Sequence, residues 1–379
     1  MYNHKWIQGI AVCFFGLGSV FLGAQSTNEQ AILAFNEAIG HFQNKKFEQA
    51  IKSYSEAIKI DPSYTKAYYN RGNTYLNLND FASAIRDYES VIKLDPKFAK
   101  APLYKGFAEM KLGNDKVAVR DFSKAIALDP KAESAFLNRG ILQVKFENFE
   151  MAIEDFQSSL ALNPNQYAAW FNLGISQYKL KEYTGAIASF TSAIDQKASW
   201  EAYEYRAKCY LQQSKYAEAI ADLNVALGQS TQPDEIYYQR AYIKQVQEDY
   251  NGAMLDYSQA IDRNPKMVKA YENRSLVAYH LEQYEVAVKD YEVLLRDKPK
   301  HIPYLLNLAV NMIKLEKWQE ANAVLTECIS IDANLKEAYF NRAHTYTKMS
   351  DLTNACKDMR MAAQLGYTEA FEHIRGLCK

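Results

Sequence analysis

The spacing of the prolines constrains this chain of 379 residues more than any other feature. Six prolines recur in one register, and neighbours within each of two groups lie 34 residues apart. They are Pro62, Pro96, Pro130 and Pro164, then Pro265 and Pro299. Proline cannot continue a helix and disfavours the helical conformation for the residue before it. Because 34 residues is the length of one helix–turn–helix hairpin, the sequence predicts equal hairpins stacked in a row.

Ten repeats cover residues 31–365, and we number each from position 1, with the proline at position 32. They begin at Ala31, Thr65, Ala99, Glu133, Tyr167, Trp200, Asp234, Val268, Ile302 and Lys336. Position 20 is alanine in all ten, position 24 is large and apolar in all ten, and position 8 is small in all ten. A small side chain at one fixed place predicts a close crossing of the two helices in each hairpin.

The fifth repeat carries the fullest set of recurring residues. They are Trp170, Leu173, Gly174, Tyr183, Ala186, Phe190 and Ala193. An aromatic, Leu-Gly, an aromatic, Ala, Phe or Tyr, and Ala in this order resemble the tetratricopeptide repeat family, and the resemblance extends over residues 31–365. It implies an all-α fold, an α-solenoid wound as a right-handed superhelix with the first helix of each repeat on the concave face.

Positions 7 and 23 change together within the chain. Position 7 is basic in seven repeats, and position 23 is aspartate in those same seven. The pairs are Arg71/Asp87, Lys105/Asp121, Arg139/Asp155, Arg206/Asp222, Arg240/Asp256, Arg274/Asp290 and Arg342/Asp358. The two positions are equidistant from the turn near position 15, so antiparallel helices should place them face to face. We therefore expect a partly buried ion pair that holds each hairpin together.

Residues 1–24 lie outside the repeats and have the layout of a secretory signal peptide, with a short basic start and an apolar segment. Cleavage after Ala24 would export the chain, and the cut before Gln25 resembles that of exported proteins of Bacteroidetes-type bacteria, which indicates the periplasm or the outer surface. The alternative is an uncleaved membrane anchor, because the apolar segment is just long enough to span a bilayer.

Residues 366–379 are predicted to form a capping helix, because the last hairpin of an array would otherwise expose its core. Cys356 in the last repeat and Cys378 in the cap could form a disulfide in an oxidising compartment, and two separate buried thiols are the alternative. Cys209 and Cys328 occupy packing positions and are expected to be inert core thiols.

The sequence shows no pattern typical of catalysis. The histidines are scattered, and there is no Cys-x-x-Cys, phosphate-binding loop or nucleophile elbow. We therefore predict no enzyme activity, no catalytic residues, no metal, no cofactor and no small-molecule substrate. A net charge of −1 without a basic run argues against nucleic acid as a partner. A membrane is a partner only if the N-terminal segment stays uncleaved.

Two patterns on the first helices indicate a binding surface. Position 6 is asparagine in seven repeats, and a row of amides can follow an extended peptide backbone because each amide both donates and accepts. The candidate peptide-binding amides are Asn70, Asn138, Asn172, Asn273, Asn307 and Asn341. The alternative is that asparagine is simply common here in the family.

The second pattern is an apolar stripe through repeats 3 to 5. It consists of Leu103, Phe107, Met110, Leu137, Ile141, Val144, Phe171, Ile175 and Tyr178. Repeat 6 interrupts it with Glu201, Glu204 and Lys208. Exposed apolar stretches of this size mark partner sites, so the stripe is predicted to bind a peptide. The alternative is that these side chains pack against neighbouring helices.

Together these features favour a non-enzymatic scaffold that binds a protein or an extended peptide in the concave groove. The alternatives are a self-associating structural or assembly subunit of a cell-envelope complex, or a holding chaperone for exported proteins. The identity of the partner does not follow from the sequence.

Overall fold

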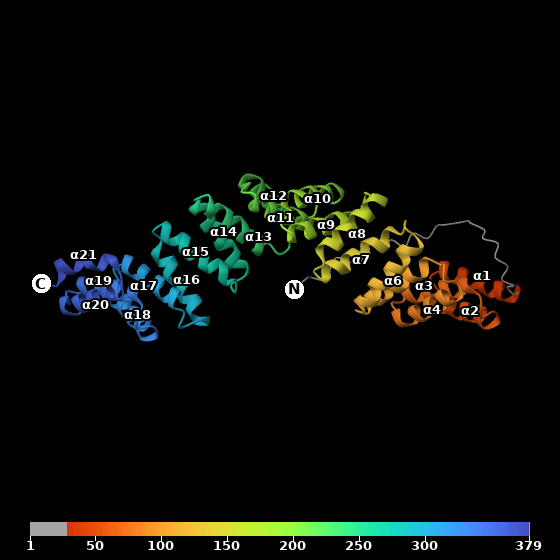
Figure 1. Ribbon diagram of the computed structural model, residues 1–379, viewed down its shortest axis with the longest axis horizontal. Helices are drawn as coiled ribbons and strands as arrows, with labels where there is room; N and C mark the ends of the chain where they lie inside the picture. Colours follow the sequence, from red (N-terminus) through yellow and green to blue (C-terminus); the bar gives the residue numbers. More distant parts are fainter. Residues whose placement is uncertain (1–28, 379) are drawn as a thin grey trace. The chain divides into compact units, whose positions relative to one another are not determined.

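The computed structural model describes residues 29–378, which form 21 helices and no strand (Figure 1). The first helices of the ten repeats are α1 (Glu29–Gln43), α3 (Thr65–Asn77), α5 (Lys100–Lys111), α7 (Glu133–Lys145), α9 (Tyr167–Lys179), α11 (Trp200–Gln212), α13 (Asp234–Val246), α15 (Val268–His280), α17 (Ile302–Lys314) and α19 (Lys336–Lys348). The second helices are α2 (Phe47–Ile60), α4 (Phe81–Leu94), α6 (Asp115–Leu128), α8 (Phe149–Leu162), α10 (Tyr183–Gln196), α12 (Tyr216–Gln229), α14 (Tyr250–Arg263), α16 (Tyr284–Asp297), α18 (Trp318–Ile331) and α20 (Leu352–Gln364). The last helix is α21 (Thr368–Leu377). The predicted all-α solenoid is confirmed.

The turn inside each hairpin has one conformation throughout the described chain. Position 15 has a positive φ in all ten repeats, and the residue after it donates its N–H to the carbonyl of position 11, as Asp80 does to Tyr75 at 2.9 Å. This is the C-terminal cap that ends many helices, and it usually uses glycine. Only Gly113 is a glycine at this position; the other nine are side-chain-bearing residues such as Lys45 and Glu147.

The turn between repeats depends on position 31. There an Asp or Asn accepts the backbone N–H two residues later, as Asp129 does from Lys131 at 2.9 Å. The proline at position 32 then prevents the second helix from continuing. The same contact recurs at the turns that contain Asp61, Asp95, Asn163, Asn264 and Asp332.

In the core of each hairpin, small side chains of one helix pack against large side chains of the other. All ten alanines at position 20 are fully buried, as the sequence predicts. Position 8 faces position 24 across the hairpin: a Cβ added at Gly174 would lie 2.7 Å from Cε1 of Phe190. A larger side chain at position 8 would therefore push the two helices apart.

Six of the seven predicted ion pairs are confirmed. They are Arg71–Asp87 (2.7 Å), Lys105–Asp121 (2.9 Å), Arg206–Asp222 (2.8 Å), Arg240–Asp256 (2.6 Å), Arg274–Asp290 (2.6 Å) and Arg342–Asp358 (2.6 Å). The pairing of Arg139 with Asp155 stays a prediction.

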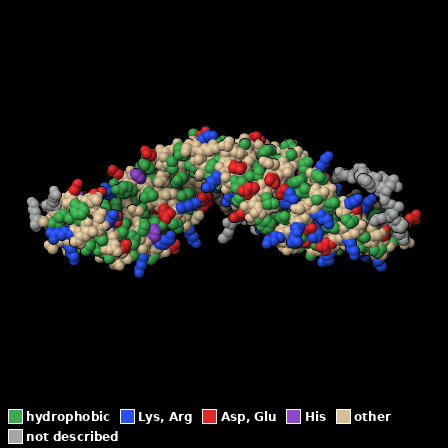
Figure 2. Space-filling model, viewed as in Figure 1, with side chains coloured by type: hydrophobic (Ala, Val, Ile, Leu, Met, Phe, Trp, Pro, Cys, Tyr) green, Lys and Arg blue, Asp and Glu red, His purple; other side chains and the backbone are tan. Residues whose placement is uncertain are grey.

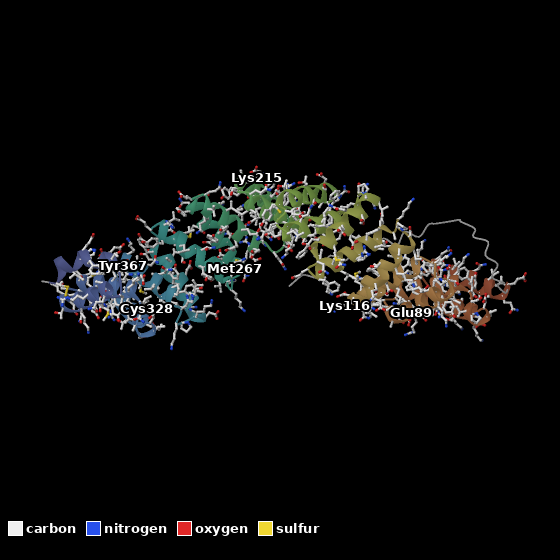
Figure 3. The ribbon with its side chains drawn as sticks, in the orientation of Figure 1. Glu89, Lys116, Lys215, Met267, Cys328 and Tyr367 are labelled. Carbon is white, nitrogen blue, oxygen red and sulfur yellow. A yellow bond between two sulfur atoms is a disulfide. The ribbon has the colours of Figure 1, made fainter. Side chains whose placement is uncertain are left out.

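The arginines also reach the preceding repeat, which the sequence interpretation did not foresee. The Nη1 group of each arginine donates to the polar side chain at position 25 of the repeat before it. These bonds are Arg71 to Ser55, Arg139 to Ser123, Arg206 to Thr191, Arg240 to Asn224, Arg274 to Ser258 and Arg342 to Thr326, at 2.6 to 3.1 Å. Lys105 instead lies 3.7 Å from Glu89, which is labelled in Figure 3. Each base therefore contacts the preceding repeat, and in the six confirmed pairs it also joins the two helices of its own hairpin.

Helix α21 packs on α20 as a cap, and the Cys356–Cys378 disulfide joins the two. The predicted bridge is thus present in the structure. Tyr367, labelled in Figure 3, lies in the turn before α21, and its ring is 4.6 Å from that of Phe340 on α19.

The chain divides into two compact units, with the boundary between Leu142 and Gln143 inside α7. The sequence predicted one uninterrupted array, so this division is new. None of the helices that the structure describes is both long and apolar enough to span a bilayer. The predicted signal peptide or anchor, residues 1–24, lies outside the described residues.

Candidate peptide-binding face

Neighbouring first helices lie side by side within each unit: α3 contacts α5, α9 contacts α11, α13 contacts α15, and α17 contacts α19. We call the surface formed by positions 5, 6, 9, 12 and 13 of these helices the first-helix face. Charged side chains of both signs are scattered over the side of the molecule drawn in Figure 2, with apolar ones between them.

The six candidate asparagines of the first-helix face are not equivalent. In Asn70, Asn138 and Asn172 the amide donates to the carbonyl four residues earlier in its own helix, at 2.7 to 2.9 Å. Asn138 is also buried, with 7% of its surface exposed. Asn273 donates to the hydroxyl of Tyr238 on the preceding first helix at 3.0 Å.

The remaining two asparagines are more accessible: Asn307 is exposed and Asn341 is half-buried. A uniform row of free amides is therefore not what the structure contains, because four of the six amide groups already donate one hydrogen bond within the protein. The asparagines retain their acceptor oxygens, and their peptide-binding role stays a prediction.

The apolar stripe of repeats 3 to 5 is less accessible than the sequence suggested. Phe171 and Ile175 are each only 7% exposed and belong to a core cluster with Phe190 and Ala202. The expectation that they face solvent is wrong. The other seven are half-buried: Leu103, Phe107, Met110, Leu137, Ile141, Val144 and Tyr178.

The physical reason lies in the next repeat. Position 6 of repeat 6 is Tyr205, where most repeats have asparagine, and its ring packs edge-on against Phe171 with centroids 5.8 Å apart. Tyr205 also lies against Tyr178, at 6.1 Å. One aromatic substitution thus covers the end of the stripe. The sequence interpretation missed it because it considered position 6 only for its asparagines and the stripe only at positions 5, 9 and 12.

The charged interruption after the stripe is an ion pair between the half-buried Lys208 and the buried Glu204. Nζ of Lys208 lies 2.7 Å from Glu204, and Gln239 donates to the same carboxylate oxygen at 2.6 Å. Burial opposes charge on the ammonium, but Glu204 outweighs it and raises the pKa of Lys208. Lys208 also lies 4.5 Å from the ring centroid of Tyr205. This cluster separates the stripe from the repeats that follow.

Exposed apolar side chains on the first-helix face gather instead in repeats 7 and 8. Tyr242 and Val246 on α13 are 41% and 43% exposed, and Leu276 and Tyr279 on α15 are 43% and 36% exposed. We call these four residues the α13–α15 patch. Three of them occupy positions 9 and 12, the same positions as the stripe, so the sequence signal was present but was not used.

Polar contacts join the N-terminal ends of the two helices that carry the patch. Lys269 pairs with Glu235 at 2.6 Å and lies 4.1 Å from the ring centroid of Tyr238. Beside the patch, the ring of His280 stacks on Tyr250 at 4.6 Å. The patch is therefore an apolar surface on a fixed frame, flanked by groups that can donate and accept hydrogen bonds.

The described residues offer little for catalysis. Within residues 29–378, no three His, Cys, Asp or Glu side chains lie close enough together to bind a metal ion. Cys209 and Cys328 are buried, and burial raises the pKa of Cys209 to about 12 and that of Cys328 to about 11. Both thiols are therefore inert near neutral pH, as predicted.

Family models agree with the observed hairpins. Models described as TPR repeat or tetratricopeptide repeat match residues 41–79, 65–98, 137–199, 195–234, 238–302 and 336–365. The chain belongs to the tetratricopeptide repeat family. Proteins of this family commonly mediate protein–protein interactions and are generally non-catalytic scaffolds. No curated protein matches this tetratricopeptide repeat protein.

Several solved structures are similar to it. The C-terminal part of a TPR repeat-containing protein from Cytophaga hutchinsonii is 20% identical with a TM-score of 0.51, covering 63% of this chain and 98% of that one. A tetratricopeptide repeat protein from Parabacteroides merdae is 21% identical with a TM-score of 0.45, covering 66% and 99%. YrrB, described as a TPR protein with an unusual peptide-binding site, is 19% identical with a TM-score of 0.47, covering 49% and 97%. At these identities the likeness concerns the fold alone.

Proposed function

We propose that this tetratricopeptide repeat protein is a non-enzymatic scaffold that binds an extended peptide segment of a partner protein across the α13–α15 patch. The observation that carries the proposal is the patch itself, four exposed apolar side chains on two adjacent first helices. Most other side chains of this face are polar, charged or half-buried. An exposed apolar patch on such a surface marks a site for a partner.

The neighbouring groups suit an extended backbone. Asn273 lies in α15, three residues before Leu276, and Asn307 occupies the same repeat position in the following first helix, α17. The amide oxygen of each can accept a backbone N–H. Apolar side chains of the peptide would then pack on Tyr242 and Leu276. Such a site would select peptides that have apolar residues at regular intervals, with little selection for the residues between them.

A random peptide library selected against the full chain tests the proposal. We expect Tyr242→Asp with Leu276→Asp to weaken the selected peptides at least about tenfold in fluorescence anisotropy, because two apolar contacts are replaced by hydrated charges. The matched control is Leu255→Asp, since Leu255 is 69% exposed on the second helix α14 and away from the first-helix face. Equal loss in both variants would overturn the proposal.

The earlier stripe provides the rival location. Phe107→Asp with Ile141→Asp changes two half-buried residues in the other compact unit. If that variant loses the peptides and the α13–α15 variant keeps them, the stripe is the binding surface.

The same patch supports one alternative, self-association of the chain as a structural subunit. Light scattering after size exclusion distinguishes the two: we expect a monomer. A dimer that Leu276→Asp dissociates would favour the alternative. We also propose that the chain is exported, and the Cys356–Cys378 disulfide supports an oxidising compartment.

A further inference from the structure

The seam between repeats 8 and 9 departs from every other seam in the chain. Consecutive repeats meet where position 27 of one second helix faces position 3 of the next first helix. The nine pairs are Ala57/Ala67, Val91/Ala101, Ala125/Ala135, Ser159/Ala169, Ala193/Ala202, Ala226/Ile236, Ala260/Ala270, Leu294/Tyr304 and Cys328/Ala338. At least one member is alanine in every pair except Leu294/Tyr304.

A cavity lies beside the two large side chains of this seam. Leu294 and Tyr304 are 3% and 7% exposed, so both are packed into the seam and neither turns outward. The hydroxyl of Tyr304 donates to Glu272 on α15, which fixes its ring as a wall between α15 and α17. A cavity of about 420 Å³ opens against this wall.

The cavity has an apolar floor and a charged rim. Its lining is Pro265, Lys266, Val268, Tyr271, Val293, Leu294, Asp297, Lys298 and Tyr304. The volume is within the range of small-molecule sites, which are mostly apolar with a few polar groups. Met267, labelled in Figure 3, marks the turn into α15 at its edge.

The rim contains a second departure from the usual repeat pattern. Position 31 is an Asp or Asn that accepts a backbone N–H at six other turns, but it is Lys298 here, as it is Lys197 at the turn after repeat 5. Neither Lys298 nor Lys266 forms an ion pair within the described chain, whereas Asp297 supplies one negative charge nearby. The lining residues therefore carry one net positive charge, and Glu272, which accepts from the hydroxyl of Tyr304, adds a negative charge next to the lining.

We propose that this cavity binds a small carboxylic acid with an apolar body. Its carboxylate faces Lys266 and Lys298, and its body lies against Leu294, Val293 and Tyr304. Asp297 disfavours a polyanion such as phosphate, since like charges repel. The site lies at the seam and outside the α13–α15 patch, so it goes beyond the proposed peptide binding and does not depend on it.

Isothermal titration of the full chain with 4-phenylbutyrate, at moderate ionic strength, tests the ligand class. We expect saturable binding at one site, with the uncharged 4-phenylbutan-1-ol about tenfold weaker and inorganic phosphate not binding, because two exposed ion pairs each contribute a few-fold. Equal binding of the alcohol, or of 4-phenylbutylamine, would overturn the proposal. So would a peptide with a free C-terminal phenylalanine that binds this cavity more tightly than the acid.

Variants locate the site. Lys298→Asp introduces the aspartate that other turns carry at position 31, so it should preserve folding. It should weaken the binding of 4-phenylbutyrate at least about tenfold. Lys300→Gln removes a lysine from the same turn that does not line the cavity, and it should change the affinity less than about twofold. Unchanged affinity in Lys298→Asp would overturn the proposal.

A second variant tests the cavity without relying on charge. Leu294→Ala with Tyr304→Ala removes two apolar side chains that line the cavity and should weaken binding of the carboxylic acid at least about tenfold, with folding checked by circular dichroism. If this double variant folds and binds the carboxylic acid as tightly as the wild type does, the site is elsewhere. Peptide capture by the α13–α15 patch should be unchanged in Lys298→Asp, which keeps the two proposals distinguishable.

Discussion

In four hairpins, a glycine at position 8 faces an aromatic ring at position 24, which limits the size of the side chain that position 8 can carry. An added Cβ would lie 2.7 Å from Phe190 at Gly174, and 3.0 Å from Phe122 at Gly106. In the repeat where Ala207 replaces glycine, the facing residue is Leu223 instead of a phenylalanine. This pair shows one combination of side chains that fits, although Ala241 faces Tyr257 elsewhere in the chain.

We expect Gly174→Ala to lower the free energy of unfolding by about 1–3 kcal/mol, because Phe190 must move in a packed core. Urea unfolding followed by circular dichroism measures the change. Adding Phe190→Leu should recover much of the loss, since that pair resembles Ala207 and Leu223.

Gly228→Ala is the matched control for that substitution. No atom lies within 4 Å of a Cβ added at Gly228 in α12, so only helix propensity acts. We expect this variant to be more stable by up to about 1 kcal/mol. If Gly174→Ala were as stable as Gly228→Ala, the proposed steric limit would be wrong.

Each arginine at position 7 satisfies a buried aspartate. Arg274 donates from Nε and Nη2 to both oxygens of Asp290, which is 1% exposed, and from Nη1 to Ser258 in the preceding repeat. Burial raises the pKa of the Asp290 carboxyl, and Arg274 opposes that rise. The pair is therefore needed mainly because either partner alone would be costly to bury.

Arg274→Ala should lower the free energy of unfolding by about 3–5 kcal/mol, because it leaves the Asp290 carboxylate buried without a partner. The double variant Arg274→Ala with Asp290→Ala should lose less. Thermal unfolding of the two variants and of Asp290→Ala completes the cycle. Additive losses would contradict the pairing.

At the scale of the helix, the sequence predicted the elements well but not their turns. Helix lengths and repeat starts follow from the prolines and from the fixed alanines such as Ala186. The left-handed residue at position 15 could not be predicted, because residues such as Lys45, Glu147 and Ser214 do not favour it. The geometry of the hairpin imposes that conformation on whatever residue is present.

The binding face was harder to predict than the helices. Periodicity indicates which positions face a surface, but exposure depends on the neighbouring repeat, and Tyr205 covers Phe171 where an asparagine would not. The α13–α15 patch was missed although its repeat positions pointed to the same face as the stripe: Tyr242 is at position 9, whereas the buried Tyr257 is at the core position 24. What the sequence could not show is how exposed position 9 is in each repeat, because that depends on the neighbouring side chains.

The capping helix α21 depends on the bond between Cys356 and Cys378, which are 22 residues apart. Closing a loop of this length stabilises a fold by about 3 kcal/mol in the chain-entropy model. We expect Cys356→Ser with Cys378→Ser to speed amide hydrogen exchange in α21 and in the adjoining part of α20. Reductant should have the same effect on the wild type and none on the variant. Equal protection in all four samples would show that packing alone holds the cap.

For the whole molecule, each repeat contacts mainly its sequence neighbours, as expected of a solenoid. Stability and binding should therefore be local properties. The α13–α15 patch and the Lys269–Glu235 pair on the same two helices lie wholly within repeats 7 and 8. Repeats that are distant from the patch should then affect peptide binding only by covering the ends of the array.

Two truncations test this local character. Residues 133–379 begin with α7 and contain the whole patch, so we expect them to bind the selected peptides within about threefold of the full chain. Residues 29–263 end with α14 and keep Tyr242 and Val246, but they lack Leu276 and Tyr279, so binding should fall at least about tenfold. Circular dichroism establishes that both fragments are helical, and anisotropy measures the affinities. If the fragment of residues 29–263 bound as well as that of residues 133–379, the partner would be held by α13 or by earlier repeats, and the two-helix patch would not be the site.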